Sequence, residues 1–266
     1  NQNTHRIAVG EPLGQFYGYI TEGLYQVDDF NYDASTQTYT LKDGIPYHGD
    51  KSRIRPGMWK FKNLTGDDNV IDENDKTVIG NAQPKFYGGL NNSFTYKGFD
   101  LSIFLTFSYG NEVLNVTKLV TSKVGSLNYN ALDVMNSSNR WMTINSDGQK
   151  VTDPGELAAL NAGKTVAAYH DAQQGDNYIH SWAVEDASYL KLSNVTLGYT
   201  FPKNLIARVG LKNLRLYATG NNLLTWTKYS GFDPEVSTMK SGLTPGVDFG
   251  AYPLSRSFIF GLNVAF

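Results

Sequence analysis

The chain has 266 residues, and its 23 Lys and Arg residues nearly balance its 25 Asp and Glu residues, which gives a formal net charge of −2. This charge gives no electrostatic reason to expect a nucleic-acid partner or an anionic membrane surface. The absence of cysteine excludes a disulfide scaffold and a cysteine nucleophile. No apolar run approaches the ~18 residues of a membrane-spanning helix. Few charged residues (18%) and many aromatic ones (13%) disfavour disorder and indicate an all-β chain.

The first region, 1–83, contains an acidic turn that is spaced like an oxygen-rich calcium loop. Oxygen-bearing side chains recur at alternate positions from Asn63 onward, and hard cations such as Ca²⁺ need several oxygens that converge. The candidate calcium ligands are Asp67, Asn69, Asp72 and Asp75. The alternative is a polar turn that uses the same Asn and Asp side chains to hold its own backbone. No other cofactor is expected.

The second region, 84–266, contains five segments in which large apolar residues alternate with small or polar ones. This period of two is typical of a strand with one apolar and one polar face. The predicted strands are about 86–96, 99–110, 187–200, 212–226 and 254–266. Each exceeds the ~5–6 residues of a typical soluble strand and suits the ~9–11 residues that a tilted strand needs to cross a bilayer. Tyr, Trp and Phe cluster at the strand ends, as at membrane–water interfaces.

One predicted strand changes phase along its length. Leu190 and Leu192 fall on the opposite face from Val195 and Leu197. We interpret this as a β-bulge near Ser193, or as a strand that has already left the apolar zone.

The connections between the predicted strands alternate in length. The turns at 97–98 and 202–211 are short, whereas the loops 111–186 and 227–253 are long. Tight periplasmic turns and long outer loops are typical of outer-membrane barrels, and this pattern places Phe266 at the periplasmic end. Within the longest loop, Asp153 followed by proline predicts a short helix over 153–163, and 111–124 is a second candidate helix.

Five strands cannot close a barrel, because bacterial barrels have at least ~8 strands. An open edge in hydrocarbon leaves backbone groups unpaired. The missing strands must therefore come from a longer parent chain or from other copies of this chain.

Several sequence blocks resemble one known family. Residues 55–80 read RPGMWKFKNLTGDDNVIDENDKTVIG and are similar to the family stretch RPGDIKYKDLNGDGVIDxNDRTVIG. Further similar blocks, in family order, lie at 18–25, 84–90, 96–102, 185–202, 216–225 and 228–236 and in the aromatic last strand. Together they resemble the C-terminal quarter of SusC/RagA-type TonB-linked outer-membrane transporters of Bacteroidota. The acidic turn departs from the family pattern, since Asn63 and Thr65 replace the family's Asp and Asn.

The resemblance implies the C-terminal strands of a 22-stranded antiparallel transmembrane β-barrel with long extracellular loops. It implies an importer of oligosaccharides or peptides in the outer membrane of a Gram-negative bacterium. The implied partners are a SusD-like surface lipoprotein that lids the barrel, the remaining barrel strands and plug, TonB acting through that plug, and membrane lipid. Because no plug sequence is present, we expect a C-terminal fragment of a longer transporter, with 1–83 as extracellular loops and strand tops.

The expected site residues follow from this reading. Aromatic side chains in the longest loop, Trp141, Tyr178 and Trp182, are candidate substrate contacts that stack on sugar rings or hold peptides. Alternatively, they pack the loop on itself or on the lid. Phe266 is expected to act as a barrel-assembly signal, as terminal aromatic residues do in similar barrels. The four histidines are scattered, and no GxSxG or phosphate-binding loop occurs, so we expect no catalytic residue and no enzyme.

Two other readings stay open. A secreted carbohydrate-binding β-sandwich or adhesin domain would also alternate along its strands, and a self-oligomerising porin could complete the barrel from its own copies. Burial of Leu101, Leu216 and Phe260 in a compact core would exclude a lipid-facing surface.

Overall fold

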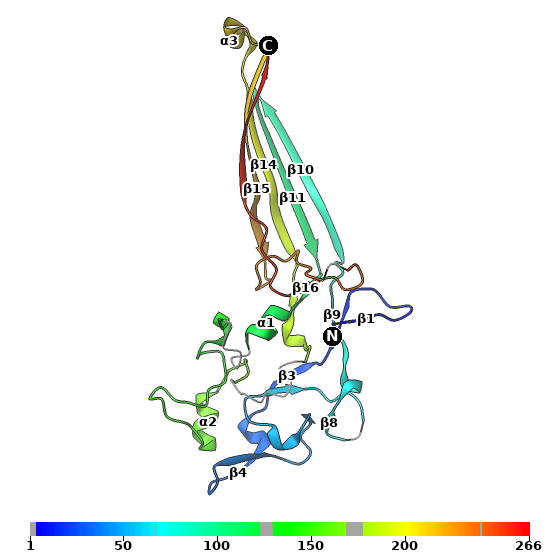
Figure 1. The fold of residues 1–266 in the computed structure, drawn as a ribbon, viewed down its shortest axis with the longest axis vertical. Helices are drawn as coiled ribbons and strands as arrows, with labels where there is room; N and C mark the ends of the chain where they lie inside the picture. Colours follow the sequence, from blue (N-terminus) through cyan, green and yellow to red (C-terminus); the bar gives the residue numbers. More distant parts are fainter. Residues whose placement is uncertain (1–3, 67, 123–129, 169–177, 240) are drawn as a thin grey trace.

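The structure is a computed structural model, and it describes residues 4–66, 68–122, 130–168, 178–239 and 241–266. Figure 1 shows two parts, a long narrow sheet that ends near the C-terminus and a lobe of short elements at its other end. The long sheet is antiparallel and has the strand order β10-β11-β14-β15-β17. Its strands are β10 Phe86–Tyr96, β11 Phe99–Tyr109, β14 Tyr189–Thr200, β15 Asn213–Thr227 and β17 Ser257–Ala265.

The hairpin between β10 and β11 turns through the two residues predicted from the sequence. Lys97 and Gly98 both have positive φ, 46° and 88°, and the strands pair directly from Tyr96 opposite Phe99. Two successive left-handed residues make a tight turn whose twist matches that of the flanking strands. Glycine is needed at the second position, because a Cβ there would also lie 2.7 Å from the carbonyl oxygen of Thr200.

The predicted β-bulge is present at Ser193. The pairing of β14 with β11 and with β15 shifts register between Leu192 and Asn194. Beyond the shift, Leu192 lies opposite Leu105, and Leu190 lies opposite Phe107. The bulge therefore returns the two leucines to the apolar face, and the strand has not left the apolar zone.

The lobe is built from short strands in several small sheets. The three-stranded sheets have the orders β1-β2-β9 and β13-β12-β16, and the pairs are β3-β7, β4-β5 and β6-β8. The bounds are β1 His5–Arg6, β2 Gln15–Gly18, β3 Thr21–Leu24, β4 Phe30–Asp33, β5 Thr38–Leu41, β6 Tyr47–His48, β7 Trp59–Phe61, β8 Val70–Ile71, β9 Thr77–Asn81, β12 Glu112–Asn115, β13 Val184–Asp186 and β16 Val247–Asp248.

Three α-helices are present in the described ranges, and all are short. They are α1 Val116–Thr121, α2 Pro154–Leu160 and α3 Lys203–Ile206. The helix predicted over 153–163 is α2, and Asp153 caps it by accepting a hydrogen bond from the Glu156 N–H at 3.0 Å. The 3-10 turns are η1 Val27–Asp29, η2 Lys51–Arg53, η3 Glu73–Asp75, η4 Asp133–Met135, η5 Ser181–Ala183 and η6 Ala207–Val209. No helix in these ranges is long and apolar enough to cross a membrane.

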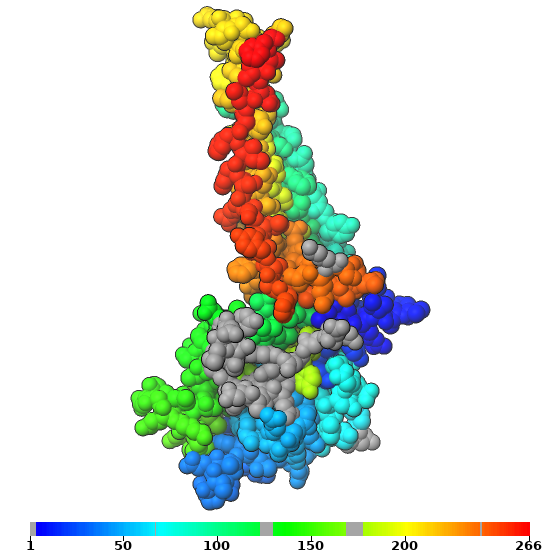
Figure 2. All heavy atoms as spheres, viewed as in Figure 1, coloured from blue at the N-terminus to red at the C-terminus, as the bar shows by residue number. Residues whose placement is uncertain are grey.

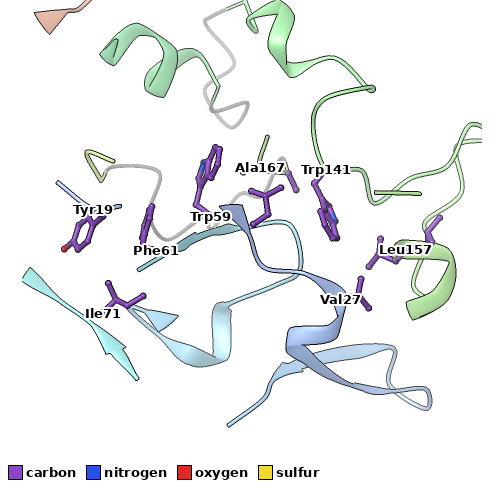
Figure 3. Packing of buried hydrophobic residues seen from close by; sticks show 11 residues of the cluster. Tyr19, Val27, Trp59, Phe61, Ile71, Trp141, Leu157 and Ala167 are labelled. Carbon is purple, nitrogen blue, oxygen red and sulfur yellow. The ribbon is translucent and has the colours of Figure 1, made fainter. Parts of the chain in front are cut away.

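The lobe has its own hydrophobic core, which joins segments that are far apart in the sequence (Figure 3). Its main cluster, called here the lobe core, consists of Tyr19, Leu24, Val27, Trp59, Phe61, Ile71, Trp141, Val151, Leu157, Ala167 and Ala168. Gly57 makes room for one member of it. Gly57 has φ +84°, and a Cβ there would lie 2.3 Å from Cγ of Trp141. The loop segments are thus fixed by tertiary packing rather than by regular strand pairing.

Candidate functional site

One face of the long sheet is apolar and open along all five strands. The pairing places Phe94, Leu101, Leu197, Ala218 and Phe260 in one row across it. Phe260 is 82% exposed and Leu216 46% exposed, and Leu101 is half-buried by its neighbours in the sheet. None of the three residues that could have excluded a lipid-facing surface lies in a compact core. Monomeric soluble proteins rarely expose an apolar surface of this extent.

Aromatic side chains mark both ends of this apolar face. At the end of the sheet that carries the β10–β11 turn, the ring centroids of Phe99 and Tyr199 lie 4.5 Å apart, and those of Tyr199 and Phe201 lie 5.0 Å apart. At the lobe end, the rings of Phe86 and Tyr109 stack at 5.0 Å. Tyrosine rings, which are apolar with one polar tip, favour membrane–water interfaces, so Tyr199 at one end and Tyr109 at the other fit a sheet that spans a bilayer.

The opposite face is polar and cross-linked between strands. Asn194 Nδ2 donates to Asn221 Oδ1 at 2.7 Å, and the hydroxyls of Thr196 and Thr219 lie 2.8 Å apart. Further toward the turns, the guanidinium of Arg215 donates to both carboxylate oxygens of Asp100, at 3.0 and 2.5 Å. This ion pair crosses Gly198, where a Cβ would lie 2.5 Å from both partners. Polar contacts between neighbouring strands suit a surface turned toward water or another protein segment, although Phe104 and Ile259 are exposed apolar residues on the same face.

The loop between β15 and β17 folds onto the lobe end of the polar face, and Figure 2 shows it in orange between the long sheet and the lobe. Glu235 of this loop accepts a hydrogen bond from the Tyr189 hydroxyl at 2.7 Å and forms an ion pair with Lys191. Lys191 is buried, whereas the side chain of Glu235 is 35% exposed, so only the lysine end of this pair is withdrawn from water. Tyr189 and Glu235 border a cavity of about 270 Å³ that also reaches Asn111 and Gly246.

The structure brings the three candidate substrate contacts to one cluster, the lobe core. Trp141 is 1% exposed, and its ring lies inside that core. Tyr178 packs edge-on against Tyr19 at 5.1 Å, and Trp182 contacts Trp59 at 4.9 Å; both keep part of their surface open. Substrate contact therefore remains a prediction for these residues, with Trp141 reachable only after a rearrangement.

The described part of the acidic turn uses its carboxylates to hold its own backbone. Asp75 is fully buried and accepts hydrogen bonds from the N–H groups of Leu64 (2.7 Å), Thr65 (2.9 Å) and Asp72 (2.8 Å). Burial alone would raise the pKa of Asp75, but these hydrogen bonds outweigh it and hold the pKa below its ordinary value. This geometry agrees with the polar-turn alternative.

Calcium binding stays a prediction. Within the described ranges, which include Asp72 and Asp75, no group of three or more His, Asp or Glu side chains is placed to hold a metal. No observation tests Asn69 as a ligand. Asp67 lies outside the described residues. A calcium titration that leaves the melting temperature of the intact protein unchanged would remove this prediction.

Glu185 has a role that sequence reasoning missed. Its carboxylate lies 3.1 Å from Lys118 Nζ and accepts hydrogen bonds from the N–H and hydroxyl of Ser230, both at 2.9 Å. Burial raises the pKa of Glu185, but the hydrogen bonds from Ser230 and the charge of Lys118 lower it below its ordinary value. The residue thereby ties α1, β13 and the loop after β15 together. No local sequence pattern signals a contact between such distant segments.

Replacing Glu185 by glutamine is expected to lower the stability of this junction by about 2 kcal/mol at neutral pH, because two charge-assisted hydrogen bonds and an ion pair weaken. Since the folded pKa is lowered, the contribution is present above the unfolded value of ~4.3 and is lost as the pH falls through the folded pKa. Unfolding of the intact protein, followed between pH 7 and pH 3, measures this contribution. Glu156→Gln, at an exposed site on α2, is the matched control and should show no such loss.

A second cavity was not foreseen from the sequence. It has a volume of about 400 Å³ and lies between β5 and the segment before α2. Its lining includes Tyr39, Arg55, Thr143, Lys150, Thr152 and Leu157. The Tyr39 hydroxyl donates to the Thr152 carbonyl at 2.7 Å, and burial, with smaller effects of Tyr32 and Asp153, raises the pKa of Tyr39 to about 12. These contacts fix one wall of the cavity.

Phe266 follows the end of β17 and is exposed. The structure gives its position at the turn end of the long sheet, where Figure 1 marks the C-terminus. Its expected role in assembly remains a prediction.

Comparison with known proteins gives several receptors of one kind, although no family profile matches the chain. TonB-dependent receptor P3 of Formosa agariphila is 33% identical over 270 residues, which cover 100% of this chain and 23% of that receptor. TonB-dependent receptor SusC of Bacteroides thetaiotaomicron is 29% identical over 204 residues, covering 74% of this chain and 17% of that receptor. These relatives are TonB-dependent receptors, in agreement with the prediction that the chain is not an enzyme.

The fold is also found in solved structures. The RagAB peptide transporter matches with a TM-score of 0.63 and 22% identity, over 99% of this chain and 24% of that one. The RagAB peptide importer in its closed-closed state matches with a TM-score of 0.60 and 20% identity, over 95% of this chain and 23% of that one. The chain spans about a quarter of the length of the TonB-dependent receptors of Formosa agariphila that it matches. It belongs to the SusC/RagA family of TonB-dependent receptors and corresponds to a portion of such a receptor.

Proposed function

We propose that this chain supplies the C-terminal strands of the barrel in a SusC-like importer of oligosaccharides or peptides, located in the outer membrane of a Gram-negative bacterium. The long sheet forms part of the wall of a closed 22-stranded barrel, in which its apolar face contacts lipid and its polar face lines the lumen. The observation that carries this proposal is the open apolar face with aromatic residues at both ends.

The division of the chain follows from the same orientation. Residues 84–266 provide the wall and two long outer loops, 111–186 and 227–253, and residues 1–83 pack with those loops as an extracellular lobe. The remaining strands and the plug come from the rest of the receptor. TonB acts through that plug, and a SusD-like lipoprotein covers the lobe. Similarity to SusC and to the RagAB structures supports these partners.

The two alternative readings receive less support. A β-sandwich would bury the apolar face under a second sheet, but Phe260 and Leu216 are exposed and the lobe lies at the end of the sheet (Figure 1). A porin built from copies of this chain would not need a parent of the length of the matched receptors.

Because the chain contains no cysteine, labelling sites can be introduced into it one at a time, and the unsubstituted receptor gives the background labelling. In the full-length receptor, single cysteines replace Ser146 in the lobe and Asn204 in α3, both exposed positions. A membrane-impermeant maleimide added to intact cells should label Ser146→Cys and should label Asn204→Cys only after lysis. Labelling of Asn204→Cys on intact cells would contradict the proposed orientation.

Substrate class is tested separately. Loss of the receptor is expected to abolish uptake of one oligosaccharide or peptide pool. Tyr178→Ala and Trp182→Ala are expected to weaken binding of that pool to the purified receptor–lipoprotein complex. Unchanged affinity in both variants would remove these residues from the site.

A further inference from the structure

We propose that the turn end of the long sheet binds the headgroups of anionic phospholipids in the periplasmic leaflet of the outer membrane. The turn end is defined here as residues 96–99, 201–212 and 265–266. This inference rests on the proposed function, because it requires the sheet to span the membrane with these turns on the periplasmic side.

The turn end is strongly cationic although the whole chain is nearly neutral. Its charged residues are Lys97, Lys203, Arg208 and Lys212, and none of the ion pairs found among the described residues includes them. The nearest acid in the sequence, Asp100, is already held by Arg215 through two hydrogen bonds. A carboxylate on Phe266 would offset one of these four positive charges, and the turn end would still be cationic. A single-sign patch of this kind attracts an anionic surface over a distance of about a Debye length, ~8–10 Å.

The two turns lie together at the tip of the sheet. The Thr200 N–H donates to the Gly98 carbonyl at 2.7 Å, and the Lys212 N–H donates to the Ala265 carbonyl at 2.8 Å. Figure 1 shows α3 beside the C-terminus at this tip. The cations of both turns therefore belong to one surface rather than to separate loops.

Apolar side chains stand among the cations. Ile206 is buried and anchors the longer turn, whereas Leu205 and Val209 are 54% and 72% exposed. Tyr96 is exposed on the shorter turn, with Lys97 Nζ 5.2 Å from its ring centroid. Exposed apolar and aromatic residues interspersed with Lys and Arg are typical of segments that lie in a membrane interface.

The arrangement favours a lipid surface over a free anion. A site for free phosphate would need donors that converge on one cavity. The cavities of about 510, 400 and 270 Å³ in the described residues are lined by other residues. The charges instead surround the end of a sheet whose apolar face continues directly into the turns. Headgroups held beside acyl chains match this combination of charge and apolar surface.

The test uses the full-length receptor in detergent micelles titrated with phosphatidylglycerol or with zwitterionic phosphatidylcholine, and counts bound lipid by native mass spectrometry. Wild-type receptor should prefer phosphatidylglycerol, and the preference should weaken with salt. Lys203→Gln/Arg208→Gln should reduce phosphatidylglycerol binding roughly 25-fold, or about fivefold per charge. Arg53→Gln/Lys62→Gln removes two exposed charges from the lobe and is the matched control, with no change expected.

Several results would overturn the inference. These are equal binding of the two lipids, unchanged phosphatidylglycerol binding in Lys203→Gln/Arg208→Gln, or complete competition by millimolar inorganic phosphate, which would indicate a free-anion site. Thermal unfolding of each variant checks that it is folded. The Asn204→Cys labelling experiment separates the two proposals. If Asn204→Cys is labelled only after lysis and lipid preference is absent, the inference fails alone. If it is labelled on intact cells, the proposed orientation fails first.

Discussion

Arginine in place of Leu105 is expected to destabilise the receptor in a bilayer by about 2–4 kcal/mol. Leu105 lies near the middle of β11 on the apolar face, opposite Leu90 on one side and Leu192 on the other. If lipid covers this face, a guanidinium at position 105 is neither hydrated by water nor paired with an acidic side chain on the same face, and its charge is therefore costly. Denaturant unfolding of the full-length receptor in lipid vesicles measures the difference.

The neighbouring residue provides the control. Thr106 points to the polar face, and its hydroxyl lies 2.7 Å from that of Ser193. Thr106→Arg should lose about 1 kcal/mol for that hydrogen bond and little more, because its charge reaches the polar side. Equal losses at the two positions would mean that both faces meet the same environment, which is incompatible with a barrel wall.

The long sheet was predictable because its signal is local. Alternation with a period of two needs only the order of residues along one strand, and Lys97 with Gly98 specifies the turn through backbone conformation alone. The change in the alternation of apolar residues near Ser193 was also visible in the sequence. The pairing with β11 shows that its cause is a β-bulge and not a strand that has left the apolar zone. The last strand was predicted to start at 254, but pairing begins at Ser257.

The lobe was predictable only as a region of loops with two short helices, the one over 153–163, which is α2, and the candidate over 111–124, part of which is α1. Its strands have two to five residues, too few to show a period. One of its pairings, β12 with β16, is parallel and joins Leu114 to Val247. Contacts such as Glu185 with Ser230, or Glu235 with Lys191, join segments that only the folded chain brings together. Such contacts depend on tertiary packing, and no spacing rule along the sequence encodes them.

The aromatic candidates show the same limit for the site. A tryptophan in a long polar loop suggests an exposed ligand contact, and the three candidates do meet in one cluster. How deeply a side chain is buried depends on the residues that pack against it. Trp141 packs against Gly57, which is distant in the sequence. Tyr178 and Trp182 remain at the edge of the lobe core and are therefore the better placed for a ligand.

Replacing Trp141 by alanine is expected to destabilise the lobe by about 3–5 kcal/mol, because a buried ring would leave a large void in its core. The loss should be local, since the long sheet shares no part of this cluster. Hydrogen exchange of the full-length receptor measures it as faster exchange at the backbone N–H groups of Trp141 and Ala168, which bond to Val166 and Gly57.

Two further variants make this result decisive about function. Trp141→Phe keeps most of the apolar volume and should restore most of the protection, whereas Tyr178→Ala, at a partly exposed position, should loosen the lobe less than Trp141→Ala. A surface ligand contact at Trp141 predicts the opposite pattern, with unchanged hydrogen exchange and weaker substrate binding in both Trp141 variants. Because a core ring and a ligand platform place the side chain in different surroundings, stability and affinity measured on the same variants assign Trp141 to one of the two roles.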